Sequence, residues 1–380
     1  MNFQFNDTQL LIRETARKFA VDRAAPGTID RDEQESFPAD LVKELGELGF
    51  MGMMVPEEWG GSGMDTVSYV LAVEEVSRVD ASLGVIMSVN NSLVCFGLNK
   101  YGTDEQKERF LRDLATGKKL GAFALSEPEA GSDATNQHTL ARKDGDSYIL
   151  NGTKNWITNG STADIIIVMA SNDRSKGSKG ISTFVVEKGT PGLTVAKKEK
   201  KLGIRSSDTV SLSFSDCRIP AGNRIGDEGA GFRFAMKTLE GGRIGIASQA
   251  LGIAQGCLDA SVRYAGERKA FDKPISQLQA IQFKIADMAT NVEASRALTV
   301  RAALLKDSGK PFGKEAAMAK LFASKTAVMA ALEAIQIHGG YGYVREYLVE
   351  RYLRDAKITE IYEGTSEIQR IVISRALLRA

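Results

Sequence analysis

The stretch from residue 358 to residue 370, ITEIYEGTSEIQR, places an acidic residue on a hinge. Glu363 is followed directly by Gly364, and Ser366 stands three residues before Gln369, which is the spacing of a helix capping box. This pattern predicts that Glu363 lies in a short connection between two helices. Its carboxylate either complements the positive end of the following helix or acts as a catalytic base on a loop held by a rigid scaffold. The stretch alone leaves both interpretations open.

Two further stretches carry hydroxyl groups and a flat aromatic side chain close to chain turns. LSEPEAGSD (125–133) contains Ser126 and Ser132, and NWITNG (155–160) contains Trp156 and Thr158. One interpretation is a pair of polar turns beside a core tryptophan. The other is a site for a planar heteroaromatic group such as isoalloxazine, which needs donors for N5 and the pyrimidine oxygens and an aromatic wall.

Glycines mark two other places. The helical pattern over 232–266 is rich in glycine, which costs about 1 kcal/mol relative to alanine inside a helix. This favours close approach of a second helix, or of a cofactor or substrate. QIHGGYGY (336–343) ends another helical pattern on Gly339 and Gly340, which either cap the helix or present N–H groups to phosphate. His338 is expected to be packed or at the surface rather than a ligand.

The composition and the missing motifs disfavour several classes of protein. Lys and Arg number 49 and Asp and Glu 48, so the net charge of +1 gives no sign of nucleic-acid binding. The three cysteines are widely spaced without a CxxC, and only two histidines occur, so no metal site is expected. The chain also lacks a P-loop, a GxGxxG between strand and helix, and a GxSxG elbow.

The sequence also bears on location. Its longest apolar runs, such as IIIVMA (165–170), are too short to span a bilayer. The N-terminal MNFQFNDTQLL has no apolar signal core. Together with reduced cysteines, these features predict a cytoplasmic protein of a bacterium or, as the alternative, the mature form of a mitochondrial matrix protein.

The elements that must position these candidate residues change in type along the chain. Helical apolar spacing predicts an N-terminal α-helical domain over 1–120. β-prone runs and turn residues predict a middle antiparallel β-barrel or sandwich over 121–231, with a hairpin turn at Asn151–Gly152. Long periodic stretches predict a C-terminal four-helix bundle over 232–380. The expected fold class is therefore α+β.

Taken together, six stretches resemble the signatures of the acyl-CoA dehydrogenases and occur in that family's order. They are FALSEPEAGSD, NGTKNWITNG, GGRIGIASQALGIAQ, ERKAF, QIHGGYGY and RDAKITEIYEGTSEIQR. The resemblance covers essentially the whole chain and is closest to the family's short-chain, butyryl-CoA branch. The family's fold agrees with the order of helices, strands and helices expected above.

The resemblance implies an FAD-dependent oxidoreductase of fatty acid β-oxidation that converts a short-chain acyl-CoA to a trans-2-enoyl-CoA. By resemblance, Glu363 removes the α-proton and the β-hydrogen leaves as hydride to flavin N5. Electrons would then pass to an electron-transferring flavoprotein. The glycine hinge would let the base swing into a dry pocket, where burial raises its pKa and the helix N-terminus opposes this.

The resemblance also implies binding residues. Positions that match FAD contacts are Leu125, Ser126, Trp156, Ile157, Thr158, Arg268, Phe271, Gln279, Gln336, Gly339, Gly340, Thr365 and Glu367. Positions that match substrate contacts are Ser132, Glu240, Arg243, Tyr362 and Gly364. Arg268 and its partners resemble residues that a neighbouring subunit supplies, which implies an obligate homotetramer.

Two departures within the family bear on the substrate. Isovaleryl-type members place the base where this chain has Gly242, which cannot serve, and glutaryl-type members carry an arginine where it has Gly84. A dicarboxylic acyl chain is therefore disfavoured. The alternatives that remain are a dehydrogenase of branched or cyclic acyl-CoA, an acyl-CoA oxidase, and a non-catalytic helical binding or scaffold protein of the same fold.

Overall fold

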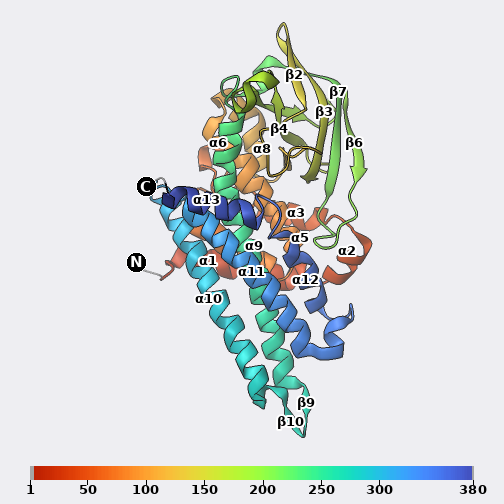
Figure 1. Cartoon of the computed structure of the whole chain (residues 1–380), viewed down its shortest axis with the longest axis vertical. Coiled ribbons are helices and arrows are strands. Elements are labelled where there is room, and N and C mark those ends of the chain that lie inside the picture. Colours follow the sequence, from red (N-terminus) through yellow and green to blue (C-terminus); the bar gives the residue numbers. More distant parts are fainter. Residues whose placement is uncertain (1–3, 379–380) are drawn as a thin grey trace.

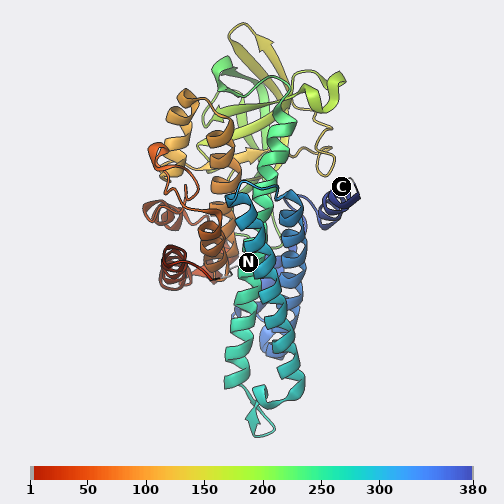
Figure 2. The same ribbon diagram turned by 90° about the vertical axis from the view of Figure 1, so that its left-hand side faces the viewer.

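The structure is a computed structural model that describes residues 4–378. It is α+β, as the sequence predicts: helices, then a β region, then a long helical bundle (Figure 1). In Figure 2 the N-terminal helices and the C-terminal helix lie on opposite sides of that bundle.

The first part of the chain is helical, with short η turns between the α-helices. Its elements are α1 (Asp7–Phe19), η1 (Ala20–Ala24), α2 (Thr28–Gln34), α3 (Ala39–Glu47), η2 (Glu57–Trp59), α4 (Thr66–Ser77), α5 (Ala81–Ser88), η3 (Val89–Cys95), α6 (Phe96–Tyr101), α7 (Asp104–Gln106), η4 (Lys107–Leu111) and α8 (Arg112–Ala115). Every residue of α4 and α5 is buried, so these two helices form the inner layer of this part.

The continuous helical stretch Ala81–Tyr101 is long and apolar enough, by length and composition alone, to cross a membrane. However, 94% of its most apolar window is buried inside the protein, as in the core helix of a globular domain. Polar residues such as Asn90 and Asn91 interrupt it, which is why no unbroken apolar run marks it in the sequence.

The middle part is a single sheet. Its elements are β1 (Gly121–Ala124), β2 (Leu140–Asp144), β3 (Ser147–Thr158), β4 (Ile165–Ser171), η5 (Arg174–Gly180), β5 (Ile181–Glu187), β6 (Leu193–Lys198), β7 (Thr209–Pro220), η6 (Ala221–Asn223) and β8 (Arg224–Ile225). Within the described residues the strand order is β6-β7-β3-β2-β4-β5-β8, with β1 also paired to β4. The expectation of a purely antiparallel sheet is wrong in detail, because β1 and β2 pair with β4 in parallel.

The hairpin turn predicted at Asn151–Gly152 is also wrong. Both residues lie inside the 12-residue strand β3, and the turn falls earlier, between β2 and β3. The register against β7 shifts between Leu150 and Gly152, and Gly152 has φ 148°. A Cβ at Gly152 would overlap Thr139, so the glycine marks a bulge with close backbone approach rather than a turn.

The C-terminal part contains the longest helices. Its elements are α9 (Gly231–Glu267), β9 (Lys269–Ala270), β10 (Lys273–Pro274), η7 (Ile275–Gln277), α10 (Gln279–Asp307), α11 (Gly313–His338), η8 (Gly339–Tyr343), α12 (Leu348–Ile358) and α13 (Ser366–Leu378). In Figures 1 and 2 the hairpin β9–β10 forms the tip of the bundle farthest from the sheet. The 37 residues of α9 span about 55 Å at roughly 1.5 Å per residue, so this helix links the sheet to the distant tip.

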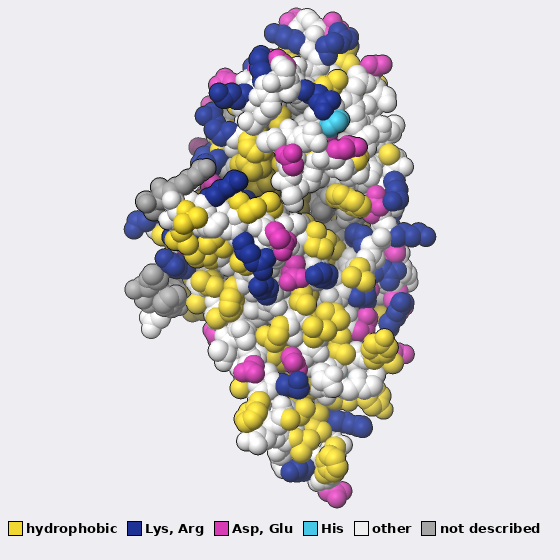
Figure 3. Space-filling model, in the orientation of Figure 1, with side chains coloured by type: hydrophobic (Ala, Val, Ile, Leu, Met, Phe, Trp, Pro, Cys, Tyr) yellow, Lys and Arg dark blue, Asp and Glu magenta, His cyan; other side chains and the backbone are white. Residues whose placement is uncertain are grey.

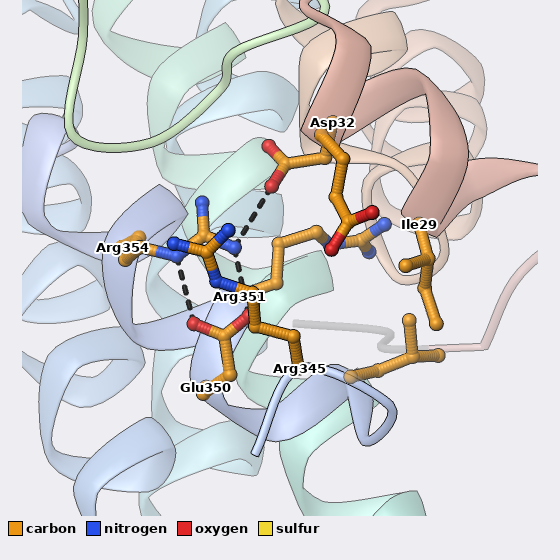
Figure 4. Close-up of a pocket in the computed structure, with 8 residues that line it drawn as sticks. Ile29, Asp32, Arg345, Glu350, Arg351 and Arg354 are labelled. Carbon is orange, nitrogen blue, oxygen red and sulfur yellow. Dashed lines mark hydrogen bonds and ion pairs between the residues drawn. The ribbon is translucent and has the colours of Figure 1, made fainter. Parts of the chain in front are cut away.

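One cluster of ion pairs fixes α12, which precedes the connection that carries Glu363. Arg354 donates to Asp32 of α2 and to Glu350, each at 2.8 Å (Figure 4). Asp355 accepts a hydrogen bond from the backbone N–H of Ile204, and burial raises the pKa of this carboxyl to about 6. All three parts of the chain therefore meet at α12.

Candidate functional site

Glu363 lies in the connection between α12 and α13, as the sequence predicts. It has φ 52° and Gly364 has φ 95°, so two consecutive residues adopt left-handed backbone conformations. That conformation costs free energy for a residue with a Cβ and is common at functional sites. The side chain of Glu363 reaches from this turn to a third helix, α9.

The predicted capping box is shifted by one residue. Thr365 rather than Ser366 caps α13, because its hydroxyl accepts from the backbone N–H of Ile368 at 3.3 Å. Ser366 is buried, and its hydroxyl has no partner among the described residues. The Gln369 side chain turns back to donate to the carbonyl oxygen of Gly364 at 2.7 Å. The left-handed Gly364 places that carbonyl within reach.

The carboxylate of Glu363 rests against helix α9 at Gly242. A Cβ at position 242 would overlap Oε2 of Glu363 and would lie 2.8 Å from the Leu93 side chain. One turn further along α9, a Cβ at Gly245 would overlap the hydroxyls of Tyr69 and Ser88, which lie 2.9 Å apart. The two glycines thus leave space for polar groups that approach α9 from different elements.

The electrostatic environment of Glu363 is that of a partly buried acid near two cations. Its Oε2 is buried and has no hydrogen-bond partner among residues 4–378. Burial raises the pKa of this carboxyl to about 7, while the charges of Lys320 and Arg243 oppose the rise. A carboxyl that titrates near neutrality is well suited to general base catalysis.

The residues matched to the flavin ring come together at the C-terminal end of strand β3. The backbone N–H of Asn155 donates to the carbonyl oxygen of Ser126 at 2.9 Å, which holds stretch 125–127 beside Trp156. Trp156 is 61% exposed and has φ 63°, so its interpretation as a core tryptophan is wrong. Ile157 beneath it is buried, and Leu125 and Thr158 are partly exposed.

A buried lysine that was not singled out in the sequence supports this arrangement. Lys154 is fully buried, donates to the Leu125 carbonyl at 3.1 Å and pairs with Glu127 at 2.6 Å. Its Nζ also donates to Gln137 at 2.5 Å. The sequence did contain a signal, because this lysine stands between β-prone residues in GTKNWIT. A lysine buried in a strand needs a partner for its charge.

The second group of matched residues lies elsewhere, at the tip of the bundle. The Arg268 guanidinium stands 5.6 Å from the ring centre of Tyr341, so the segments around 268 and 340 meet. Phe271 is 86% exposed with φ 53°. Gln279, Gln336, Gly339 and Gly340 are exposed in the same region. One chain therefore does not bring these residues to the flavin-ring group, because α9 separates them (Figure 1).

The remaining matched positions have varied surroundings. Glu240 pairs with Lys237 at 3.1 Å, and Arg243 is buried with its Nε unpartnered among the described residues. The Tyr362 hydroxyl donates to the side chain of Gln249. Two exposed residues complete the set, namely Ser132 and Glu367, the latter paired with Arg370 at 3.0 Å.

Two other glycines of the glycine-rich pattern over 232–266, and His338, have structural roles. Cβ atoms at Gly252 and Gly256 would overlap the backbone carbonyls of Glu74 and Arg78, so α9 packs closely on α4 there. His338 is buried and stacks on Tyr264 with ring centres 4.1 Å apart, as expected for a packed histidine.

The two groups of residues fit the halves of a flavin dinucleotide. Trp156 presents an uncovered aromatic surface beside partly exposed Thr158, which suits a planar ring with polar edges. At the other end of the bundle, Cβ atoms at Gly339 and Gly340 would meet nothing within 4 Å, so a phosphate could approach this backbone beside the Arg268 cation. The chain contains no cluster of His, Cys, Asp and Glu that could hold a metal ion within its described residues.

Comparison with known families gives three consecutive matches. The descriptions are "Acyl-CoA dehydrogenase, N-terminal domain" for residues 6–118, "Acyl-CoA dehydrogenase, middle domain" for residues 122–217 and "Acyl-CoA dehydrogenase, C-terminal domain" for residues 229–378.

Individual proteins are similar over nearly the full length. The short-chain specific acyl-CoA dehydrogenase of mitochondria from Rattus norvegicus is 56% identical over 98% of this chain and 91% of its own. The butyryl-CoA dehydrogenase from Megasphaera elsdenii has a TM-score of 0.98 at 48% identity, covering 100% of both chains. A chain solved in work on the electron transferring flavoprotein of Acidaminococcus fermentans has a TM-score of 0.99 at 50% identity, again covering 100% of both.

Proposed function

Because the chain belongs to the acyl-CoA dehydrogenase family, we propose that it dehydrogenates a short-chain acyl-CoA to the trans-2-enoyl-CoA with Glu363 as the base. The observation that carries this assignment is the buried, unpartnered Oε2 of Glu363 on its left-handed turn beside Gly242. A carboxylate without a structural partner is free to accept a proton.

The chain's own residues prepare the removal of the α-proton. Glu363 is ionised above about pH 7 and can then take the proton on its carboxylate. The neighbouring cations Lys320 and Arg243 favour that ionised form. FAD, when bound, supplies the acceptor for the β-hydrogen, which leaves as hydride. Proton and hydride together account for the two hydrogens lost from the thioester.

The cofactor would be held by both groups of residues. Leu125, Ser126 and Trp156 to Thr158 would bind the ring end, with Thr365 and Glu367 on the connection to α13. Arg268, Phe271, Gln279, Gln336, Gly339 and Gly340 would bind the dinucleotide end. The two groups lie far apart in one chain, which supports completion of each site by a second copy. The resemblance to the family extends this association to the homotetramer that we propose.

The acyl-CoA would be bound by Ser132, Glu240, Arg243, Tyr362 and Gly364. The short acyl chain is proposed from the named relatives, two of which act on short-chain or butyryl substrates. We propose an electron-transferring flavoprotein as the electron acceptor, since a chain of the same fold was solved in work on such a protein. We also propose that the protein is located in the cytoplasm or, as the alternative, in the mitochondrial matrix. The proposed domains cover residues 1–120, 121–231 and 232–380.

The function is tested by mixing FAD-loaded protein with acyl-CoA thioesters in the absence of oxygen. We expect butyryl-CoA to bleach the visible flavin absorbance and to give the enoyl-CoA, faster than long straight chains do. Faster bleaching by branched or cyclic acyl-CoA would support that alternative. Reoxidation by oxygen as fast as by electron-transferring flavoprotein would indicate an oxidase, and no bleaching by any thioester would contradict the proposal.

A further inference from the structure

Lys320, in the middle of α11, is a buried cation without an ion pair. Its side chain is fully buried, and no carboxylate oxygen lies within 4.0 Å of its Nζ among the described residues. Lys154, the other fully buried lysine, has Glu127 at 2.6 Å. Burying an ammonium group without a counter-charge is unfavourable, so a position that retains one needs a reason.

The one hydrogen-bond partner that Lys320 has among residues 4–378 belongs to the connection that carries Glu363. Its Nζ donates to the carbonyl oxygen of Gly364 at 2.7 Å. The Gln369 side chain donates to the same oxygen at 2.7 Å and to the Glu363 carbonyl at 3.3 Å. Two donors from two different helices thus hold the left-handed turn from both sides, and they use both lone pairs of one carbonyl.

The charged groups that act on the pKa of Lys320 come from α9, from the connection between α12 and α13, and from α13. They are Arg243 of α9, Glu360 and Glu363 of the connection, and Glu367 of α13. Among these anions, Glu363 has the largest effect on the pKa of Lys320, and Lys320 has the largest charge effect on Glu363. Both groups are desolvated, so each is the other's principal counter-charge although they share no hydrogen bond.

We propose that Lys320 is a positioning residue for the base: its hydrogen bond to Gly364 holds the turn that aims Glu363, and its charge favours the ionised form of Glu363. This inference rests on the proposed function for its catalytic consequence. The hydrogen bond and the charge are separable, because glutamine at position 320 keeps a donor and loses the charge, whereas methionine loses both.

The experiment titrates Glu363 directly in FAD-loaded protein. The protonated carboxyl band in infrared difference spectra is assigned by its absence from Glu363→Gln and followed against pH in wild type, Lys320→Met and Lys320→Gln. Removing a neighbouring cation raises the pKa of a carboxyl, so both variants should titrate about one pH unit above wild type. The acid limb of kcat/KM with butyryl-CoA should move by the same amount.

The plateau of kcat above the acid limb separates the two roles of Lys320. Lys320→Met should lose roughly 10- to 100-fold there, because the turn is no longer held, and Lys320→Gln should lose less. Ala327→Gly, fully buried two turns away on α11, is the control: it should lower thermal stability and leave the titration of Glu363 unchanged.

Two results would overturn the inference. One is a Glu363 midpoint in Lys320→Gln within about 0.3 pH units of wild type, which is well inside the expected shift. The other is an equal shift in Ala327→Gly. If Lys320→Met does not fold, the Glu363 titration in Lys320→Gln alone tests the inference. If wild type fails to oxidise any acyl-CoA, the proposed function fails, yet the infrared titration still tests the pairing of Lys320 with Glu363.

Discussion

At the scale of the residue, Glu363 is shaped by two opposing effects. Burial of Oε2 favours the protonated acid, and the charges of Lys320 and Arg243 favour the ionised base. Burial is the larger effect, since the pKa lies at about 7 rather than below the ordinary value. The left-handed turn adds strain that the surrounding hydrogen bonds must offset.

A pH dependence follows from this balance. Only ionised Glu363 can accept a proton, and its pKa is raised to about 7, so kcat/KM should fall as the pH drops below about 7. A steady-state profile with butyryl-CoA between pH 5 and 9, taken where the flavin stays bound, measures this limb. A limb near the ordinary carboxyl range, around pH 4 to 5, would show that burial does not govern the base.

The contact between Glu363 and Gly242 makes a second prediction. Glu363→Gly should be nearly inactive, and adding Gly242→Glu should restore part of the rate, because position 242 faces the same carboxylate site. Truncation at 363 also removes the overlap that a Cβ at 242 would meet. Rescue should be partial, since Leu93 crowds the new side chain and a small misplacement of a reacting group costs roughly 100-fold.

The rescue is measured as turnover of butyryl-CoA with an artificial acceptor at equal FAD content. Gly241→Glu in the Glu363→Gly background is the matched control, because its neighbours are Lys306 and Ser92 rather than Glu363. Equal rates in the Gly242 and Gly241 double variants would contradict the shared site.

The sequence predicted that Glu363 lies on a hinge between two helices, but it did not predict the residues that support this hinge. Gly364 next to Glu363 is a local signal, and so is the approximate start of α13. The roles of Lys320 and Lys154 depend on hydrogen bonds to carbonyl oxygens that lie 44 and 29 residues away along the chain, respectively. Long-range partners of this kind leave no periodicity in the sequence.

At the scale of the element, α9 combines two uses of glycine that the sequence could not separate. Gly242 leaves space for the Glu363 carboxylate, and Gly252 and Gly256 permit close packing against α4. Which glycine serves which purpose depends on the side of the helix that meets each neighbour. Composition alone shows only that small residues are concentrated there.

A pair of alanine substitutions on α9 tests this difference. Gly252→Ala should destabilise the protein by about 1–3 kcal/mol, because its Cβ would overlap the Glu74 carbonyl. Gly266→Ala meets nothing within 4 Å and should unfold at or above the wild-type temperature. Thermal unfolding of the FAD-loaded variants measures both. Equal effects of the two substitutions would mean that α9 and α4 do not pack as described.

The strands show how a correct local signal can be misplaced. Asn151–Gly152 is a strong hairpin dipeptide, yet the chain continues through it in β3. Pairing on both sides, with β2 and with β7, overrides the turn propensity and converts it to a bulge. The parallel pairing of β1 with β4 likewise could not be predicted from local sequence patterns, because two other strands separate β1 from β4 along the chain.

At the scale of the whole molecule, the proposed cofactor residues form two separate groups, one at the end of strand β3 in the sheet and one at the tip of the bundle. Hydrophobic side chains are also gathered over the lower, C-terminal half of the face in Figure 3, between scattered charges. Among the residues of that half, Phe271 and Tyr343 are each 86% exposed. Both observations fit a chain that completes its sites by association, as the resemblance of Arg268 and its partners to residues of a neighbouring subunit implies.

This arrangement predicts that FAD retention depends on assembly. Arg268→Ala should loosen FAD and shift the protein towards smaller oligomers, because a cofactor bound between subunits stabilises their association by mass action. Arg142→Ala, an exposed arginine on β2 at the other end, should change neither property. Sizing chromatography with absorbance at protein and flavin wavelengths measures both. A stable monomer with a full complement of FAD would refute the divided site.

The central claim is that Glu363 is the base, and one comparison tests it most directly. Glu363→Gln keeps the size of the side chain and removes its ability to accept a proton, so the variant should fold, bind FAD and bind butyryl-CoA as wild type does. Its rate of flavin bleaching in a single anaerobic turnover should fall by several orders of magnitude, since Glu363 supplies the carboxylate nearest to Gly242 among the described residues. Bleaching within about tenfold of wild type, at equal FAD content, would contradict the account.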